Sequence, residues 1–492
     1  MAPQDDGLYQ ATATTKAPLI QETGVTESSR IGMRHRKLAQ HLDLKDLIPL
    51  SVSSVGPLFS VAATGGVMAA YAGVWTLPAI FILAFPFIVS SFVFRLLNKH
   101  FPQAGASYHW SARVLGESIS RYQAWILILA YFTSIPPIAI PAGSYTIALI
   151  APQDQSSSVL QAGVTLFWIV FAAVPLLLGA KPTARITQVF FTIEMLALTA
   201  FAVIGISRLN RISVPIHFSK PPIGGMLVVA VIAATILDGW EIDSYAAEES
   251  KKPREHPGLG GIIGAFGALL FYALLYPLMI GETPIHKLAN SSDPLAVWAS
   301  RLIPGHGWAM LIPVLASTAG GLWLTTYILT RALYAMGRER LLPVGFAKLN
   351  KRNVPSLAIL VTLSLTFLVV LGETFISSLS SFFNLILSAA GFFLLAEFFM
   401  DSLTAVIFLT FGHKRLPELS IHPHKHKMLM VFSFISSLMM GALLVAFFIY
   451  GPKAIGAGID QTLLVLLGLG IVFTYLTRKR KASSFIFEGK SV

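Results

Sequence analysis

Three carboxylic acids stand close together in a segment that is otherwise apolar enough to lie in a membrane. Residues 226–254 read MLVVAVIAATILDGWEIDSYAAEESKKPR and contain Asp238, Glu241 and Asp243. A carboxylate in the hydrocarbon core costs roughly 2.5–3.5 kcal/mol unless it is paired or faces water. Gly239 lies between these acids and indicates an interrupted helix, which a membrane tolerates only where the freed backbone lines a cavity. This segment therefore predicts a binding site within the membrane.

The composition indicates that lipid surrounds most of the chain. Of its 492 residues, 54% are hydrophobic and 12% are charged, whereas a soluble protein carries roughly 25% charged residues. The chain contains no cysteine, which excludes disulfides and thiolate metal sites. No phosphate-binding loop is recognisable, so ATP-driven chemistry has no support and we expect neither a cofactor nor a bound metal ion.

The apolar segments predict an all-α membrane protein. Twelve windows of about 20 mostly apolar residues can each span the membrane as a helix. They lie near 46–68, 73–94, 122–150, 159–179, 187–206, 223–248, 259–280, 311–336, 355–372, 385–411, 428–450 and 462–477. Their apolar character is continuous rather than alternating, which favours helices over a β-barrel.

The distribution of basic residues sets the orientation of these helices. Twelve crossings place both termini on one side, and the segments on that side then hold 30 of the 36 Lys and Arg residues. Positive charge is retained in the cytoplasm, so the tails at 1–43 and 478–492 are predicted to be cytoplasmic. The net charge of +12 thus follows from membrane topology, and we expect no nucleic-acid partner.

The first and the sixth spans both carry polar interruptions. In the first, Pro57 lacks an N–H group and clashes with the preceding turn, which predicts a break near 55–58. Five spans separate this break from the one near 237–241. That spacing predicts an inverted repeat of residues 44–206 and 223–412, with two appended helices at 428–477. The alternative for the serine-rich first span is helix packing through small residues.

Two broken helices that face each other can bind a zwitterion. A break exposes N–H groups that attract anions and C=O groups that attract cations. We expect one wall of such a site to consist of Ser53, Ser54, Val55, Gly56, Pro57 and Ser60, and the other of Leu237, Asp238, Gly239, Trp240 and Glu241. Asp238 could instead cap the second half-helix. Trp240 is either a gate that stacks over an ammonium group or a packed aromatic side chain.

Four stretches of the chain form a recognisable set: FPQAGASYHW (101–110), KPTARITQVFFTIE (181–194), DGWEIDSYAAEESKKPRE (238–255) and RALYAMGRERLLPVGFAKLNKRNVPSLAIL (331–360). In this order they resemble motifs of the amino acid–polyamine–organocation superfamily of secondary transporters, and the resemblance covers roughly residues 43–412. Two positions depart from the family pattern: Ala106 replaces a glycine, and Ser53 to Pro57 replace a glycine–x–glycine pattern at the first break. The resemblance implies a plasma-membrane permease, not an enzyme, that carries an amino acid or related amine by alternating access with a proton gradient.

Further acids inside the predicted spans could bind cations. Glu194 lies where a resembling proton-coupled relative has lysine. A buried carboxyl group can exchange a proton near neutral pH, so Glu194 is our candidate for coupling, with a neutral acid bonded between helices as the alternative. Glu397 and Asp401 stand four residues apart on one helix face. Together with Asp243, these two could face a cation, or they could be bonded to Ser402, Thr404 or neighbouring helices.

The acidic interior keeps a second substrate class open. Polyamines or other organic cations, carried by uniport, exchange or sodium coupling, are the alternative to an amino acid carried with protons. A sensor on the same scaffold would bind its ligand without transport, and a membrane enzyme would alter it chemically. Glu248 and Glu249, beside Lys251, Lys252 and Arg254, are expected to form a surface ion-pair network or an inner gate.

Overall fold

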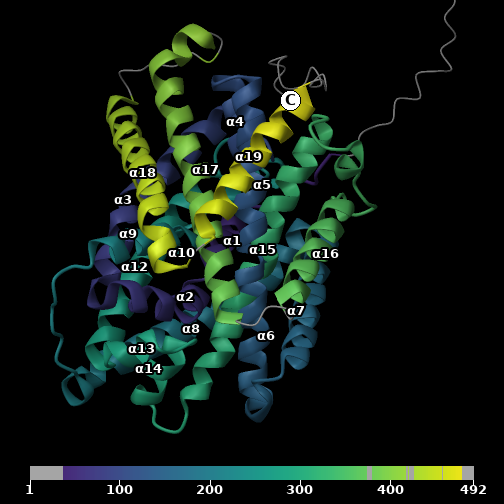
Figure 1. Cartoon of the computed structure of the whole chain (residues 1–492). Helices are drawn as coiled ribbons and strands as arrows, with labels where there is room; N and C mark the ends of the chain where they lie inside the picture. Colours follow the sequence, from purple (N-terminus) through teal and green to yellow (C-terminus); the bar gives the residue numbers. More distant parts are fainter. Residues whose placement is uncertain (1–36, 374–378, 417–418, 420–425, 457, 479–492) are drawn as a thin grey trace, which may run out of the picture. The chain divides into compact units, whose positions relative to one another are not determined.

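The computed structural model describes residues 37–373, 379–416, 419, 426–456 and 458–478. Within these ranges the secondary structure is helical (Figure 1). Leu42 and Ser250 additionally form an isolated parallel β-bridge. Most of the predicted tails at 1–43 and 478–492 falls outside the described residues, so the cytoplasmic location of both termini stays a prediction.

The twelve predicted spans are present as helices. They are α1–α2 (Leu44–Val55 and Pro57–Ala72), α3 (Thr76–His100), α5–α6 (Glu117–Ser134 and Pro136–Ile150), α7 (Ser158–Leu178), α8 (Ala180–Ile212), α9–α11 (Ile223–Ile232, Ala234–Leu237 and Ile242–Tyr245), α12 (Leu259–Glu282), α15 (Leu311–Arg338), α16 (Ser356–Glu373), α17 (Leu379–Arg415), α18 (Lys427–Ala454) and α19 (Ile459–Arg478). Several extend beyond the apolar windows, because helices continue into the polar surroundings after the hydrocarbon core ends.

Length and composition agree with a membrane protein. Nine helical segments of the described chain are long and apolar enough to cross a bilayer, and Leu44–His100 has 57 residues, enough for two crossings. The shorter apolar helices Ile223–Leu237 and Ser356–Gly372 complete the set of twelve. Large apolar side chains, such as Leu196 on α8 and Ile471 on α19, are exposed in the isolated chain, as expected for helices that contact lipid.

The first span is broken where the sequence indicates. Helix α1 ends at Val55 and α2 begins at Pro57, with Gly56 between them in the left-handed region (φ 56°). Glycine adopts this conformation without the steric cost of a Cβ atom. Pro57 occupies the first position of α2, where its missing N–H group would have no helical partner in any case.

The sixth span is broken in the same manner. Helix α10 ends at Leu237, Asp238 is extended, and Gly239 has φ 101° before α11 begins at Ile242. The helical turns on either side are short, and α11 is followed by a 3-10 turn at Ala247–Glu249. Both breaks lie near the middle of their spans, as a central site requires.

Three short helices outside the spans were not predicted. They are α4 (Ala106–Val114), α13 (Ile285–Ala289) and α14 (Pro294–Leu302). Helix α4 packs against α5 and α17, whereas α13 and α14 pack against α2. Helix α17 in turn lies beside α5 and α18 (Figure 1). The division of the chain into repeats at 44–206 and 223–412 stays a prediction.

Candidate functional site

The two breaks are in direct contact. Gly239 of the sixth span lies against the backbone of Ser54 in the first, so the freed peptide groups of both spans meet. Helices α12 and α15 supply glycines that approach the same wall: Gly264 faces Ser51, and Gly320 faces Ser53. The predicted site residues are all buried, namely Ser53, Ser54, Val55, Gly56, Pro57, Ser60, Leu237, Asp238, Gly239, Trp240 and Glu241. The structure therefore brings both predicted walls together.

Protein groups bind the amides at the start of α2. Glu194 Oε1 accepts a hydrogen bond from the Leu58 amide at 3.1 Å. Ser317 Oγ accepts one from the Phe59 amide at 3.1 Å and donates to Glu194 Oε1 at 2.6 Å. The other carboxyl oxygen of Glu194 is buried and has no partner among the described residues. Glu194 thus occupies amides at the break that would otherwise be free to attract an anion.

Protein groups also bind the carbonyls at the ends of α1 and α10 and the Gly239 amide in the sixth-span break. Ser60 donates to the Val55 carbonyl at 2.8 Å, and Tyr272 donates to the Ile236 carbonyl at 2.6 Å. Glu241 folds back and accepts from the Gly239 amide at 3.0 and 2.8 Å. Tyr131 donates to the same carboxylate at 3.0 Å. These contacts allow broken helices to exist in a buried place, where unpaired backbone groups are costly.

Several polar groups at the breaks remain available to a ligand. Asp238 is 8% exposed, and none of the other described residues donates a hydrogen bond to its carboxylate. Helix α11 has Glu241, not Asp238, at its N-cap position. The hydroxyls of Ser51, Ser53 and Ser54 likewise have no partner in the described part of the chain. A ligand with several donors could satisfy this set of acceptors.

Trp240 packs among aromatic side chains. Its ring lies 5.1 Å from that of Phe94 and 5.6 Å from that of Phe398, centroid to centroid. Gly261 and Gly264 of α12 lie against it, and a Cβ atom at either would approach within 3.0–3.1 Å. The Nε1–H donor of Trp240 is buried and has no partner within the described ranges. The packing alternative is therefore present in this conformation, and the gate stays a prediction.

Asp243 contacts the start of α12. Its Oδ2 accepts from the Gly258 amide at 2.5 Å and from the Gly261 amide at 2.7 Å. These amides are among those that the first turn of a helix leaves without helical partners. A carboxylate stabilises them through hydrogen bonds and through the helix dipole. The contacts give Asp243 a structural role and lend no support to its predicted cation-facing role.

Glu397 and Asp401 share their partners. Ser107 of α4 lies 3.0 Å from Glu397 Oε1 and 2.8 Å from Asp401 Oδ2. Tyr245 of α11 donates to Glu397 at 2.7 Å, and Gln123 of α5 donates to Asp401 at 2.8 Å. The acids are thus bonded to neighbouring helices, as one alternative held, and not to Ser402 or Thr404.

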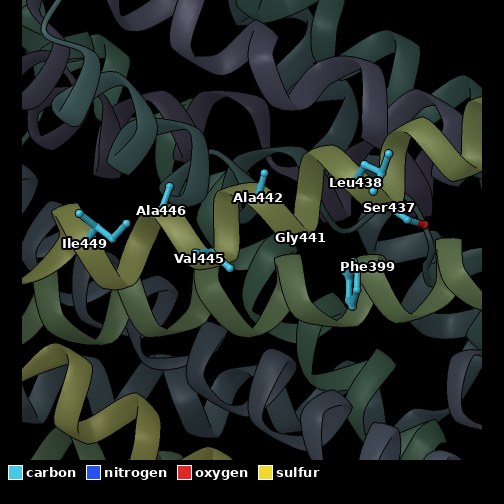
Figure 2. Close-up of a pocket in the computed structure, with 8 residues that line it drawn as sticks. All are labelled: Phe399, Ser437, Leu438, Gly441, Ala442, Val445, Ala446 and Ile449. Atoms are coloured by element: carbon cyan, nitrogen blue, oxygen red, sulfur yellow. The ribbon is translucent and has the colours of Figure 1, made fainter.

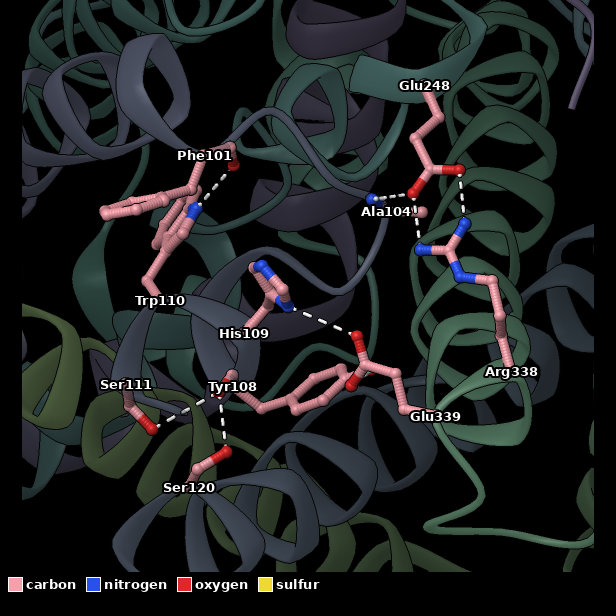
Figure 3. Close-up of polar contacts among 10 residues, drawn as sticks. All are labelled: Phe101, Ala104, Tyr108, His109, Trp110, Ser111, Ser120, Glu248, Arg338 and Glu339. Carbon is pink, nitrogen blue, oxygen red and sulfur yellow. Dashed lines mark hydrogen bonds and ion pairs between the residues drawn. The ribbon is translucent and has the colours of Figure 1, made fainter. Parts of the chain in front are cut away.

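A second polar network joins three segments at the end of the bundle that is predicted to be cytoplasmic (Figure 3). Arg338, the last residue of α15, forms a two-pronged ion pair with Glu248 at 2.8 and 2.7 Å. Glu248 also accepts from the Ala104 amide at 3.0 Å. Tyr108 and His109 of α4 bind Glu339 at 2.9 and 3.2 Å. We call Ala104, Glu248 and Arg338 the latch.

The neighbouring acid Glu249 binds the same helix. Arg331 approaches both of its oxygens at 3.1 Å, and the Tyr327 hydroxyl donates to it as well. The Glu249 backbone carbonyl accepts from the amides of His41 and Leu42 at 2.9 Å each. The partners of Glu248 and Glu249 are therefore the arginines of α15, and not the lysines adjacent in sequence.

Ion pairs also tie the start of α1 to its surroundings. Lys181 of α8 contacts Asp46 at 2.5 Å. Lys251 contacts the partly exposed Asp43 at 2.7 Å, and this hydrogen bond lowers the pKa of the Asp43 carboxyl below its ordinary value of 3.8. These pairs join α1 to α8 and to the segment that follows the sixth span.

An apolar groove that includes none of the break residues lies between α17 and α18 (Figure 2). It has a volume of about 500 Å³ and is lined by Phe399, Ser437, Leu438, Gly441, Ala442, Val445, Ala446 and Ile449. Its lining carries no charged side chain, so it offers nothing that would recognise a charged amine. We therefore place the candidate site at the helix breaks.

Sequence reasoning missed the residues that complete the site from other helices. Ser317, Tyr131 and Tyr272 lie within largely apolar helices, whereas Ser107 and Gln123 stand among other polar residues in α4 and at the start of α5. Polar side chains inside membrane helices usually face the bundle interior. That rule could have nominated Ser317, Tyr131 and Tyr272 as partners of the acids, although not which acid each one binds.

Comparison with known proteins agrees with this architecture. The family model described as "Amino acid permease" matches residues 42–473. The chain is 24% identical to the branched-chain amino acid permease BcaP of Lactococcus lactis over 477 residues, which cover 90% of this chain and 96% of the relative. It is 24% identical to the methylthioribose transporter of Bacillus subtilis over 64% of this chain and 71% of the relative. It is 22% identical to the cationic amino acid transporter 3 of Arabidopsis thaliana over 65% and 55%, respectively.

Proposed function

Because the chain belongs to the amino acid permease family, we propose that it carries an amino acid across the plasma membrane as a proton-coupled secondary transporter. The observation that supports this most directly is the contact between the two helix breaks at Ser54 and Gly239. Such a contact between opposed broken helices concentrates backbone dipoles at one buried point. Alternating access would then expose this point to one side of the membrane at a time.

The proposed coupling follows from competition for one amide. Leu58 donates to Glu194 in this structure, and a substrate carboxylate bound at the start of α2 would need the same donor. Two carboxylates cannot share it without strong repulsion unless one of them is protonated. Substrate binding would therefore displace Glu194 and favour its protonation. The ammonium group of the substrate would meet Asp238 and the hydroxyls of Ser53 and Ser54.

A second substrate class has specific support. The amides of Leu58 and Phe59 already have protein partners, whereas the carboxylate of Asp238 receives no hydrogen bond from the other described residues. A ligand with extra positive charge would gain most from such a site. Cationic amino acids or polyamines are therefore the alternative to neutral amino acids, and the relatives named above include transporters of both branched-chain and cationic amino acids.

Uptake into liposomes that contain the purified protein tests the proposal. Labelled leucine, arginine and spermidine serve as probes, each with and without an inward proton gradient. We expect one of them to accumulate and the gradient to increase its accumulation. If folded wild-type protein accumulates none of these probes while it binds one of them, a sensor replaces the transporter. A chemically altered probe would indicate an enzyme.

The variant Ser54→Trp tests the site itself. An indole at this position fills the contact between the breaks and should abolish uptake. The control is Ser207→Trp, because Ser207 lies on the exposed face of α8 and should tolerate the same side chain. Size-exclusion chromatography of both variants establishes that equal amounts of folded protein are compared. Normal uptake by Ser54→Trp would reject the site at the breaks.

A further inference from the structure

The acid pair on α17 lies in a network with too few hydrogen atoms for two ionised carboxylates. Three hydroxyl–carboxylate contacts are present: Ser107 with Glu397 at 3.0 Å, Ser107 with Asp401 at 2.8 Å, and Tyr245 with Glu397 at 2.7 Å. The hydroxyls of Ser107 and Tyr245 also lie 3.1 Å from each other, but this contact involves no carboxylate. Each hydroxyl–carboxylate contact needs a proton between its two oxygens, and a hydroxyl group supplies one. Ser107 and Tyr245 therefore supply two protons for the three contacts with carboxylates.

One proton on Asp401 resolves the shortage. If Oδ2 of Asp401 is protonated, it donates to Ser107, and Ser107 is then free to donate to Glu397. Tyr245 donates to Glu397 as before, and the Gln123 amide donates to the other oxygen of Asp401 at 2.8 Å. With both acids ionised, a lone pair of Ser107 would instead face a carboxylate oxygen at hydrogen-bond distance inside a buried site, which is strongly unfavourable.

Two unpartnered atoms indicate that the network can bind more than this one proton. Oε2 of Glu397 and Oε1 of Gln123 are buried without any hydrogen-bond partner in the described part of the chain. Both residues are fully buried, and no basic side chain within the described ranges forms an ion pair with either acid. A buried carboxylate that lacks a cation and has an open oxygen is a site for a proton.

We infer that Glu397 and Asp401 form a proton-binding site on α17, in which Asp401 holds one proton and Oε2 of Glu397 binds and releases a second. The step is a simple protonation: the Glu397 carboxylate gains H⁺ on Oε2 and becomes neutral, and it returns the same H⁺ on release. The site is separate from Glu194. Its use in coupling rests on the proposed transport function, whereas the binding of the proton does not.

The surroundings of the pair bear on its proton affinity. Helix α17 packs against α3, α4, α5, α6, α9, α10, α18 and α19. Their titratable or charged residues are Arg95, Lys99, His100, Tyr108, His109, Arg113, Glu117, Arg121, Tyr122, Tyr131, Tyr145, Lys427, Tyr450, Lys453, Asp460, Tyr475 and Arg478. Tyr245 of α11 is the titratable residue bonded to the pair. Asp238 and Glu241 lie at the break directly after α10, which packs against α17, so a positive ligand at the break would repel a proton at Glu397.

Infrared spectroscopy of the purified full-length protein tests the inference without any transport measurement. Spectra are recorded in deuterated and ordinary water at about pH 5 and about pH 8, the range in which protein stability tends to be highest. The carbonyl band of a protonated carboxyl group reports each proton. We expect a band at both pH values from Asp401, and an additional component at the lower pH from Glu397.

Isosteric variants assign the two bands. Asp401→Asn should lose the band that persists at the higher pH, and Glu397→Gln should lose the component that appears at the lower pH. Asp154→Asn, which alters an exposed acid in a loop, should lose neither. If both bands persist in the two α17 variants, the inference is wrong. It is equally wrong if sodium, compared with choline, removes the low-pH component of the wild type.

A third variant tests the assignment even if Asp401→Asn or Glu397→Gln does not fold. Ser107→Ala keeps both acids and removes the hydroxyl that joins them. We expect both carbonyl bands to shift in frequency, because the hydrogen bond that Asp401 donates and one that Glu397 accepts are lost. Unshifted bands in Ser107→Ala would show that the bands come from other acids, and that result would overturn the assignment to α17.

Discussion

Gly239 lies so close to Ser54 that a Cβ atom on Gly239 would stand 2.6 Å from both the carbonyl carbon and the carbonyl oxygen of Ser54. Real Cβ atoms do not approach backbone this closely, so the contact between the breaks requires glycine. The requirement is independent of backbone conformation, although Gly239 also has φ 101°. The first and the sixth spans approach each other so closely here that no side chain fits between their backbones.

The substitution Gly239→Ala should therefore abolish uptake and lower the thermal unfolding temperature. Gly116 offers a matched control, because it has the same φ of 101° but would meet nothing within 4 Å of an added Cβ atom. Gly116→Ala should cost only the backbone strain of its positive φ, on the order of 1–3 kcal/mol. Equal unfolding temperatures for the two variants would show that the contact with Ser54 does not matter.

Glu194→Gln tests coupling at the start of α2. Glutamine keeps a carbonyl oxygen for the Leu58 amide and the Ser317 hydroxyl, but it cannot bind a proton. We expect uptake to lose its dependence on pH and on the proton gradient, while exchange of internal for external substrate continues. Counterflow and gradient-driven uptake, measured on the same liposomes, separate these two activities.

The control for this prediction is Glu255→Gln. Glu255 is exposed and pairs with Lys252, so its replacement should leave the pH profile unchanged. An unchanged profile in Glu194→Gln itself would remove Glu194 from coupling and would leave it as a structural link between α2, α8 and α15.

The fold and the break positions were predictable because each depends on local composition. A membrane helix needs about 20 apolar residues in a row, whatever its neighbours are. A break is marked by residues such as Pro57 and Gly239, whose backbone preferences are intrinsic. The span 385–411 and the break near 237–241 were therefore found from sequence, and both are present as α17 and as the gap between α10 and α11.

The partners across the site were not predictable for the opposite reason. The bond from Ser317 to Glu194 joins residues 123 positions apart, and that from Ser107 to Glu397 joins residues 290 positions apart. Nothing local distinguishes Ser317 from a serine that bonds to its own helix, as Ser437 does. The role of Asp243 was missed in the same way, because the amides it binds belong to the next helix.

The latch should control access to the site from the side predicted to be cytoplasmic. Arg338→Ala removes the two-pronged pair with Glu248, and truncating one partner of such a pair costs on the order of 2 kcal/mol or more. We expect the closed state to lose population accordingly. The chain has no native cysteine, so Ser54→Cys can report access through its rate of labelling by an impermeant maleimide in inside-out vesicles.

Labelling of the single variant Ser54→Cys should be slow, because Ser54 is only 7% exposed. The double variant that also carries Arg338→Ala should be labelled roughly tenfold faster or more. Lys252→Ala is the control, because its pair with Glu255 is exposed and surface pairs contribute little. If Arg338→Ala labels no faster than Lys252→Ala, the latch does not hold this side closed.

Asp293 should add a pH dependence to stability that is unrelated to transport. It lies at the start of α14, where its carboxylate accepts from the Ala296 amide at 2.9 Å. Burial raises the pKa of this acid from 3.8 to about 6, although the helix amides act in the opposite direction. Its contribution to stability is therefore fully present below 3.8 and is lost as the pH rises through about 6.

Asp293→Asn should remove this dependence, because asparagine caps a helix about as well as aspartate and does not ionise. We expect the unfolding temperature of the wild type to fall relative to that of the variant as the pH rises from about 5 to about 7.5, since the ionised acid is then buried. Differential scanning fluorimetry at several pH values measures this. Parallel curves for the two proteins would contradict the raised pKa. Because Asp43 has a lowered pKa, its pair with Lys251 cannot produce the same effect in this pH range.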